Sequence, residues 1–303
     1  MSKWKRELHN ILTAPPLNEE PMSQHTTLRV GGKAEVLAFP QNYNELADLI
    51  SLAKRENVPV VIVGQGSNLL VKDGGIEGIV VSLSHLCSHI EFLNTRIKAG
   101  SAVLLNTLVW ESANRGLKGL EFAAGIPGSL GGAIYMNAGA YGSSIGDFVR
   151  EVYVADYRGN FYSLTTSDFM FSYRWSSFQR EEYIILEALL ELYEGDSREI
   201  VHKVENILAE RRNKHPRFPS AGSIFRNPPG NPAGYLIEQA GAKGITEGGA
   251  QVSPQHGNFI INKSGATSRD VLNLIEKVRN KVKDKFDIEL ELEIQVIGKN
   301  GFE

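Results

Sequence analysis

The sequence predicts a mixed fold of the α+β or α/β class, because short apolar strands and amphipathic helices alternate along the chain. Residues 58–63, VPVVIV, are typical of a buried strand, and residues 197–212 carry apolar side chains at helical spacing. Two glycine-rich segments, 64–75 and 125–142, interrupt the pattern, and the second holds six glycines. Glycine lets a ligand lie directly against the main chain, so this pair favours a long, phosphate-containing ligand over ordinary surface turns.

Length and composition fit a globular protein of two or three domains, since the chain has 303 residues and 22% charged residues. The net charge of -3 argues against bulk binding of nucleic acid. A lone cysteine, Cys87, excludes an internal disulfide and fits a reducing compartment. The N-terminus lacks the apolar core of a signal peptide, and no run of about 18 apolar residues exists. We therefore expect a cytoplasmic protein without a membrane span.

The first half of the chain predicts helices and short strands around the two glycine segments. The expected elements are a helix capped by Asn44, strands at 58–63 and 78–83, a helix over 104–115 that ends at Gly116, and a hairpin over 152–164.

The second half begins with a strand, YIILEALLELY, and a helix capped by Ser197. The loop at 215–222 is the expected domain boundary. Beyond it lie the segment 233–240, a strand at 257–262 and a helix over 267–285, whose start resembles a capping box of Thr267 and Asp270. Apolar residues alternate strictly over 288–296, which predicts a final strand. Its polar face carries Glu289, Glu291 and Glu293, and periodicity does not choose among them.

The segment GQGSNLL at 64–70 is not a Rossmann fingerprint, because Leu69 occupies the third glycine position. Its backbone amides can instead face a diphosphate, although a plain turn explains the segment equally well. His85 and His89 stand four residues apart without a third ligand, so we expect no metal site.

Three further segments carry candidate polar chemistry. Arg174 lies among aromatic residues in YRWSSF, where its fork can bind a carboxylate or simply cover apolar neighbours. Residues 211–217 gather basic side chains, which fit either a solvated helix end or an anionic ligand. Ser223, in AGSIF, is either a turn residue or a functional hydroxyl, and no GxSxG motif supports a hydrolase.

Taken together, the chain resembles the UDP-N-acetylenolpyruvoylglucosamine reductase family of flavoenzymes in bacterial cell-wall synthesis. The resemblance runs from about His25 to Gly298. It rests on HTTLRVGG, GQGSNLL, GIPGSLGGAIYMNAGAYG, YRWSSF, AGSIFRNP and LELEIQVIG, which occur in the family's order. No room exists after YRWSSF for the extra substrate-covering loop of longer members, so the chain resembles the shorter subtype.

The resemblance implies an α+β fold with a vanillyl-alcohol-oxidase-type FAD-binding module of two subdomains and a C-terminal α+β substrate-binding domain. The implied division is 1–83 with 288–303 for the first subdomain, 84–205 for the second and 206–287 for the substrate domain. The implied activity is reduction of UDP-N-acetylglucosamine enolpyruvate to UDP-N-acetylmuramate, with NADPH as hydride donor and non-covalent FAD as cofactor. The implied partners are these small molecules, with no nucleic acid and no obligate protein partner.

The resemblance also implies roles for individual residues. Ser223 matches the proton donor, Arg174 the arginine at the substrate carboxylate and Glu293 the glutamate of a terminal LxPEV pattern, in which Leu292 replaces proline. The implied substrate-binding residues are Tyr173, Lys214 and Asn227. The implied FAD-binding residues are Gly64, Gly66, Ser67, Asn68, Leu69, Gly125, Ile126, Pro127, Gly128, Gly131, Gly132, Ala133, Asn137, Gly139 and Ala140.

Two other functions compete with this one. A flavin oxidase or dehydrogenase acting on an alcohol or hydroxy acid could use the same FAD fold, but AGSIFRNP and the terminal glutamate argue against it. A non-catalytic nucleotide-sugar-binding protein would not need Arg174, Ser223 and Glu293 together.

Overall fold

The computed structural model describes residues 2–301, which form two compact units. Unit 1 contains the chain up to Asn18, Val36–Gly64 and Gly78–Glu210, and unit 2 contains Glu19–Glu35, Gln65–Glu77 and the chain from Arg211 on. The helices are α1 (Lys3–Ile11), α2 (Tyr43–Arg55), α3 (Leu105–Asn114), α4 (Leu130–Met136), α5 (Ser197–Lys214), α6 (Ala233–Gln239) and α7 (Ser268–Phe286). None of the helices within residues 2–301 is both long and apolar enough to cross a membrane.

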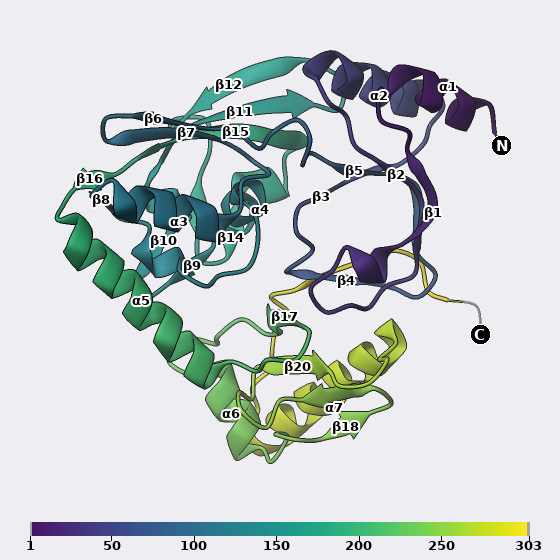
Figure 1. The fold of residues 1–303 in the computed structure, drawn as a ribbon. Coiled ribbons are helices and arrows are strands. Elements are labelled where there is room, and N and C mark those ends of the chain that lie inside the picture. The colour runs from purple at the N-terminus through teal and green to yellow at the C-terminus, as the bar shows by residue number, and fades with distance from the viewer. Residues whose placement is uncertain (1, 302–303) are drawn as a thin grey trace. The chain divides into compact units, whose positions relative to one another are not determined.

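The main sheet of unit 1 is antiparallel and has the strand order β12-β11-β15-β7-β6. Its strands are β6 (Ile90–Leu93), β7 (Arg96–Gly100), β11 (Val149–Asp156), β12 (Phe161–Thr165) and β15 (Tyr183–Glu191). Val152 and Val154 face the core that contains α3 and α4, which lie along one side of the sheet in Figure 1. Ala155 and Ile184 join the core formed with α1 and α2. Both faces of β11 and β15 therefore contribute residues to a core.

A second sheet has the strand order β1-β2-β5-β3, with β1 (Leu17–Pro21), β2 (Lys33–Ala38), β3 (Val60–Val63) and β5 (Ile76–Ser82). Strands β3 and β5 run parallel, and Val60 lies opposite Ile79. Short two-stranded ribbons complete unit 1: β8 (Leu117–Lys118) with β16 (Tyr193–Glu194), β9 (Gly139–Ala140) with β10 (Ser143–Ser144), and β13 (Phe171–Ser172) with β14 (Trp175–Ser176).

The hairpin between β11 and β12 is closed by the Asp156 side chain. One carboxylate oxygen accepts hydrogen bonds from the N–H groups of Arg158 (2.8 Å) and Asn160 (2.9 Å). Partial burial pushes the pKa of Asp156 upward, but these bonds and that from the Asn160 side chain outweigh it and bring the pKa to about 2. The ionised carboxylate thus stabilises the predicted hairpin.

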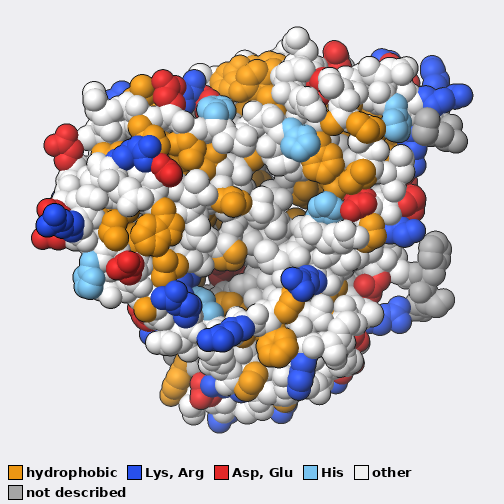
Figure 2. All heavy atoms as spheres, viewed as in Figure 1, with side chains coloured by type: hydrophobic (Ala, Val, Ile, Leu, Met, Phe, Trp, Pro, Cys, Tyr) orange, Lys and Arg blue, Asp and Glu red, His pale blue; other side chains and the backbone are white. Residues whose placement is uncertain are grey.

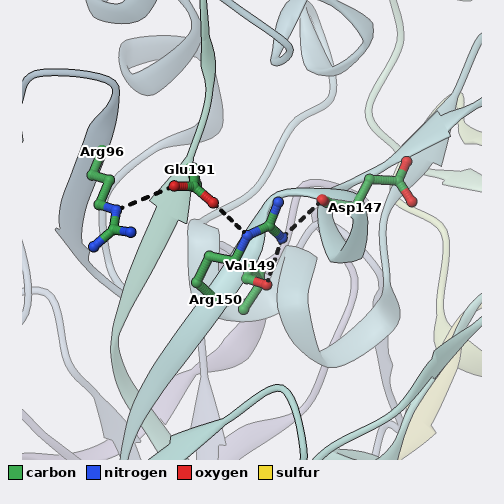
Figure 3. Close-up of polar contacts among 5 residues, drawn as sticks. All are labelled: Arg96, Asp147, Val149, Arg150 and Glu191. Carbon is green, nitrogen blue, oxygen red and sulfur yellow. Dashed lines mark hydrogen bonds and ion pairs between the residues drawn. The ribbon is translucent and has the colours of Figure 1, made fainter.

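A small ionic network fixes the chain where it leaves the second glycine segment (Figure 3). Arg150 donates from Nε to Glu191 at 2.9 Å and from Nη1 to the carbonyl oxygens of Asp147 (3.1 Å) and Val149 (3.2 Å). Arg96 donates to the other oxygen of Glu191 at 3.3 Å. Hydrogen bonds from Arg150 and then Arg96 hold the pKa of Glu191 below its usual value. The network joins β7, β11 and β15 beside the irregular start of β11.

Unit 2 is built on an antiparallel sheet of order β17-β20-β19-β18, with β17 (Ser220–Ser223), β18 (Thr246–Glu247), β19 (Ala250–Val252) and β20 (Phe259–Asn262). Helices α6 and α7 pack on it around a core that includes Phe225, Leu274 and Val278. The helices lie beside this sheet in the green and yellow part of Figure 1. A separate parallel pair joins β4 (Leu69–Val71) to β21 (Gln295–Ile297).

Most predicted elements are present, and two predicted caps are wrong. The α2 cap is Asn42, whose side chain accepts from the Glu45 N–H at 2.9 Å, because a capping residue must stand outside the helix, whereas Asn44 already lies within the first turn. Helix α5 is capped by Asp196, while the Ser197 hydroxyl donates to Ala113 O at 2.9 Å. The capping box of Thr267 and Asp270 is confirmed.

The predicted final strand over 288–296 is wrong in its extent, because ladder pairing covers only β21 and an isolated bridge at Leu292. Alternate side chains of this segment are nevertheless buried, as Leu290 and Ile294 show. Burial of alternate side chains needs only an extended chain, whereas a strand needs a continuous partner. The three-part domain division stays a prediction, and its ends at residues 1 and 302–303 lie outside the described residues.

Candidate functional site

The first glycine loop, residues 64–69, follows β3, and its backbone conformation suits an anion. Gly66 has φ +60°, and a Cβ there would lie 2.1 Å from the carbonyl oxygen of His25. Throughout residues 2–301, no protein group accepts a hydrogen bond from the main-chain N–H groups of residues 65–68. Adjacent unpaired N–H groups form the kind of concavity that binds phosphate oxygens. The loop therefore has free donors that can meet a diphosphate, one of the two explanations that its sequence left open.

The second glycine segment, residues 125–142, folds into α4, and its glycines have different tasks. The N–H groups of Leu130 and Gly131 donate to the carbonyl oxygens of Val103 and Ser101, both at 2.8 Å. A Cβ at Gly131 would lie 2.7 Å from the Ser101 Cβ, so this glycine permits close backbone packing. The start of α4 is thus satisfied within the protein. The main-chain N–H groups at 128–129 have no acceptor anywhere in residues 2–301 and are the ones that can meet a ligand.

The arginine hairpin, residues 171–176, is held by the end of α4. Asn137 terminates that helix with φ 45°, donates from Nδ2 to Ser172 O at 2.7 Å and accepts from the Gly146 N–H at 3.0 Å. Arg174 lies at the hairpin tip with φ 53°, and its guanidinium stands 5.3 Å from the Tyr173 ring centroid. A non-glycine residue in this backbone region marks a position that the surroundings fix closely. The hairpin therefore presents Arg174 in a defined place, and its fork can bind a carboxylate.

Ser223 ends β17 directly after an irregularity in strand pairing. Ser220 lies opposite Ile261 and Ser223 opposite Phe259, so one extra residue is accommodated between them, where Gly222 has φ +76°. Such bulges redirect side chains and occur beside active sites. Its hydroxyl is half-buried and makes no hydrogen bond to any group in residues 2–301, so it can reach a ligand.

Glu293 lies beside this serine segment, residues 220–227, and differs in burial from the other two glutamates of the terminal segment. Its N–H donates to Ile224 O at 2.8 Å, and its carbonyl oxygen accepts from Asn68 Nδ2 at 3.1 Å. Glu289 and Glu291 are exposed, whereas Glu293 is half-buried. Unit 2 thus brings together Ser223, Glu293 and the Asn68 of the first glycine loop, which are far apart in sequence.

Two predicted substrate residues lie in nearby stretches of unit 2. Lys214 is the last residue of α5, and Figure 2 shows Lys and Arg side chains gathered in the lower left, where that helix ends. Asn227 accepts from the Ala233 N–H at 2.9 Å and so helps to cap α6. Asn227 therefore has a structural task beside any contact with a ligand.

The sequence missed Asn258 as part of this region. It is 4% exposed and bonds the main chain of Phe225, two residues after Ser223. In the sequence, Asn258 is an asparagine directly before an apolar strand. It belongs to no motif or residue spacing that would indicate a role in the site.

Cys87 offers no alternative chemistry to this site. Burial raises the pKa of its thiol to about 12, so the sulfur stays protonated and inert at neutral pH. Among residues 2–301, no three His, Cys, Asp or Glu residues form a group that could hold a metal ion.

Comparison with known proteins assigns families to both parts of the chain. Residues 34–165 match the family model "FAD binding domain", and residues 214–297 match "UDP-N-acetylenolpyruvoylglucosamine reductase, C-terminal domain". The UDP-N-acetylenolpyruvoylglucosamine reductase of Caldanaerobacter subterraneus subsp. tengcongensis is 47% identical over 92% of each chain. That of Bacillus subtilis is 40% identical over 99% of this chain and 100% of its own. The crystal structure of the Thermus caldophilus enzyme of similar name aligns with a TM-score of 0.78 at 33% identity, over 93% of this chain and 97% of its own.

Proposed function

This chain belongs to the UDP-N-acetylenolpyruvoylglucosamine reductase family, and we propose which of its residues perform the family's reaction. The predicted family, α+β class and FAD cofactor are confirmed. The protein is an FAD-dependent oxidoreductase that reduces the enolpyruvyl ether of UDP-N-acetylglucosamine, with NADPH as hydride donor, in peptidoglycan precursor synthesis. Bound FAD would supply the hydride-transfer chemistry between NADPH and the substrate.

The residues of the first glycine loop fit this cofactor. Unpaired main-chain N–H groups at 65–68 can hold diphosphate oxygens, and Gly66 allows the turn that exposes them. We assign FAD contacts to both glycine segments, with the N–H groups at 128–129 as the donors of the second. Gly131, Gly132 and Asn137 then support the segment through packing, capping and hydrogen bonds more than through direct polar contact.

Ser223 is the proposed proton donor. Hydride addition to the enolpyruvyl group places negative charge beside a carboxylate, and the adjacent carbon then needs a proton. The single observation that carries this assignment is that half-buried Ser223 has a hydroxyl without a hydrogen-bond partner in residues 2–301. The next residue, Ile224, is hydrogen-bonded to Glu293. An enolate is a strong base, so even a hydroxyl can serve as its acid.

Arg174 and Glu293 support the same step in this proposal. The Arg174 fork binds the substrate carboxylate and stabilises the developing charge, which is what a preorganised cation does best. Glu293 orients the donor or the substrate. Tyr173, Lys214 and Asn227 hold the nucleotide-sugar part. Use of soluble nucleotide substrates and the free, buried Cys87 support a cytoplasmic location.

Anaerobic absorbance spectra test this proposal directly. The purified protein should be yellow, and acid denaturation should leave the flavin in the supernatant, because neither glycine segment contains a histidine or cysteine that could bind it covalently. NADPH should bleach the flavin band, and the enolpyruvyl nucleotide should restore it. A flavin band that is bleached by an alcohol or hydroxy acid, but is not restored by the enolpyruvyl nucleotide after reduction, would instead identify the competing oxidase.

A further inference from the structure

Asn258 bonds the chain next to Ser223 through both its main chain and its side chain. Its carbonyl oxygen accepts from the Ile224 N–H at 2.9 Å. Its side-chain Oδ1 accepts from the Phe225 N–H at 2.9 Å, and its Nδ2 donates to the Phe225 carbonyl oxygen at 2.8 Å. A single buried residue thus bonds the three successive peptide groups that follow Ser223.

The other edge of the same stretch is fixed by the terminal segment. Ile224 O accepts from the Glu293 N–H at 2.8 Å, and the Arg226 N–H donates to Glu291 O at 2.9 Å. The stretch 224–226 is therefore held between Asn258 on one side and 291–293 on the other. Asn258 thus bonds two of the three residues that pair with the segment carrying Glu293.

Neighbouring groups keep Asn258 itself in place. Its N–H donates to His256 Nδ1 at 3.2 Å, and the Ser253 hydroxyl oxygen, which is fully buried, accepts from the His256 N–H at 3.3 Å. Burial lowers the pKa of His256, so the ring is neutral near pH 7 and Nδ1 can accept that bond. The turn before β20 is therefore a rigid support with satisfied polar groups.

We propose that Asn258 is a positioning residue for the reaction, which sets the place of the Ser223 hydroxyl by clamping residues 224–225. The proposal rests on the proposed role of Ser223. The simpler alternative is a buried asparagine that satisfies Phe225 and contributes to stability alone. The two differ in outcome, because a stability role affects both half-reactions alike, whereas misplacing Ser223 affects only the one that needs its proton.

The test compares Asn258→Ala with the parent in anaerobic stopped-flow. Bleaching of the flavin by NADPH should stay within about threefold, while restoration by the enolpyruvyl nucleotide should slow on the order of 10²-fold, a loss that a misplacement of about 1 Å can cause. Amide hydrogen exchange of 224–226 should rise in the same variant. If Asn258→Ala yields no folded flavoprotein, Asn258→Asp, which keeps the size and one acceptor, is held to the same criterion.

Asn262→Ala is the matched control, because Asn262 ends β20, the strand that Asn258 precedes, and its side chain likewise donates to main-chain oxygens, those of Leu28 and Arg29, and accepts from the Ala266 N–H. It should leave both half-reactions near the parent rates.

The double variant Ser223→Ala/Asn258→Ala should restore colour no more slowly than Ser223→Ala, because Asn258 acts through that serine. Equal slowing of both half-reactions, an equal effect of Asn262→Ala, or multiplicative losses in the double variant would overturn the proposal. A Ser223→Ala variant with parent kinetics would refute the proposed function itself.

Discussion

Replacement of Ser223 by alanine removes one hydroxyl and little else. The strand pairing of Ser223 with Phe259 uses main-chain groups, which alanine retains. Since the hydroxyl has no hydrogen-bond partner among residues 2–301, its loss leaves no buried polar group unpaired. The free energy of unfolding should therefore change by no more than about 0.5 kcal/mol.

The catalytic effect should be far larger and confined to one half-reaction. General-acid help is typically worth about 10²–10⁴ in rate. Each factor of ten corresponds to about 1.4 kcal/mol, so the barrier to substrate reduction should rise by about 2.8–5.6 kcal/mol. Oxidation of NADPH at the flavin needs no such acid and should stay close to the parent rate.

Stopped-flow absorbance separates these two steps. The variant should bind FAD, lose its colour with NADPH normally and then regain it with the enolpyruvyl nucleotide at least about 10²-fold more slowly. Ser220→Ala, in the same strand, is the control and should leave both rates unchanged. Recovery of colour in Ser223→Ala within about tenfold of the parent would show that Ser223 is not the acid.

The structure supports three further expectations. Arg174→Lys keeps the charge but loses the fork, so kcat/KM for the enolpyruvyl substrate should fall about tenfold or more while flavin bleaching by NADPH is spared. Gly66→Ala should lower the FAD content seen in absorbance spectra, because a Cβ would lie 2.1 Å from His25 O, whereas Gly142→Ala, with φ +82° and nothing within 4 Å, should retain FAD. Asp156 has a pKa of about 2, below its unfolded value, so its contribution to stability is present above about pH 4 and lost as pH falls toward 2. Asp156→Asn should remove that part of the pH dependence in acid unfolding followed by circular dichroism.

Local sequence signals predicted the elements whose causes are local. The capping box of Thr267 and Asp270 and the hairpin around Gly159 were readable because their partners lie within a few residues. The same reasoning misplaced the α2 cap by two residues, since Asn42 and Asn44 offer the same side chain and only the actual start of the helix separates them. It also extended the final strand over 288–296, because alternation records burial and not pairing.

The order of motifs along the chain determined the family, the α+β class and the cofactor, since a set of segments in a fixed order is a property of the sequence itself. Tertiary structure alone decided which of three alternating glutamates is half-buried beside Ile224, because burial depends on what the strand meets. It also decided that Gly131 serves packing against Ser101, and that Asn258 clamps the chain after Ser223. These contacts join residues more than 25 positions apart, and no local preference of an asparagine, a glycine or a glutamate encodes the partner that the fold brings to it.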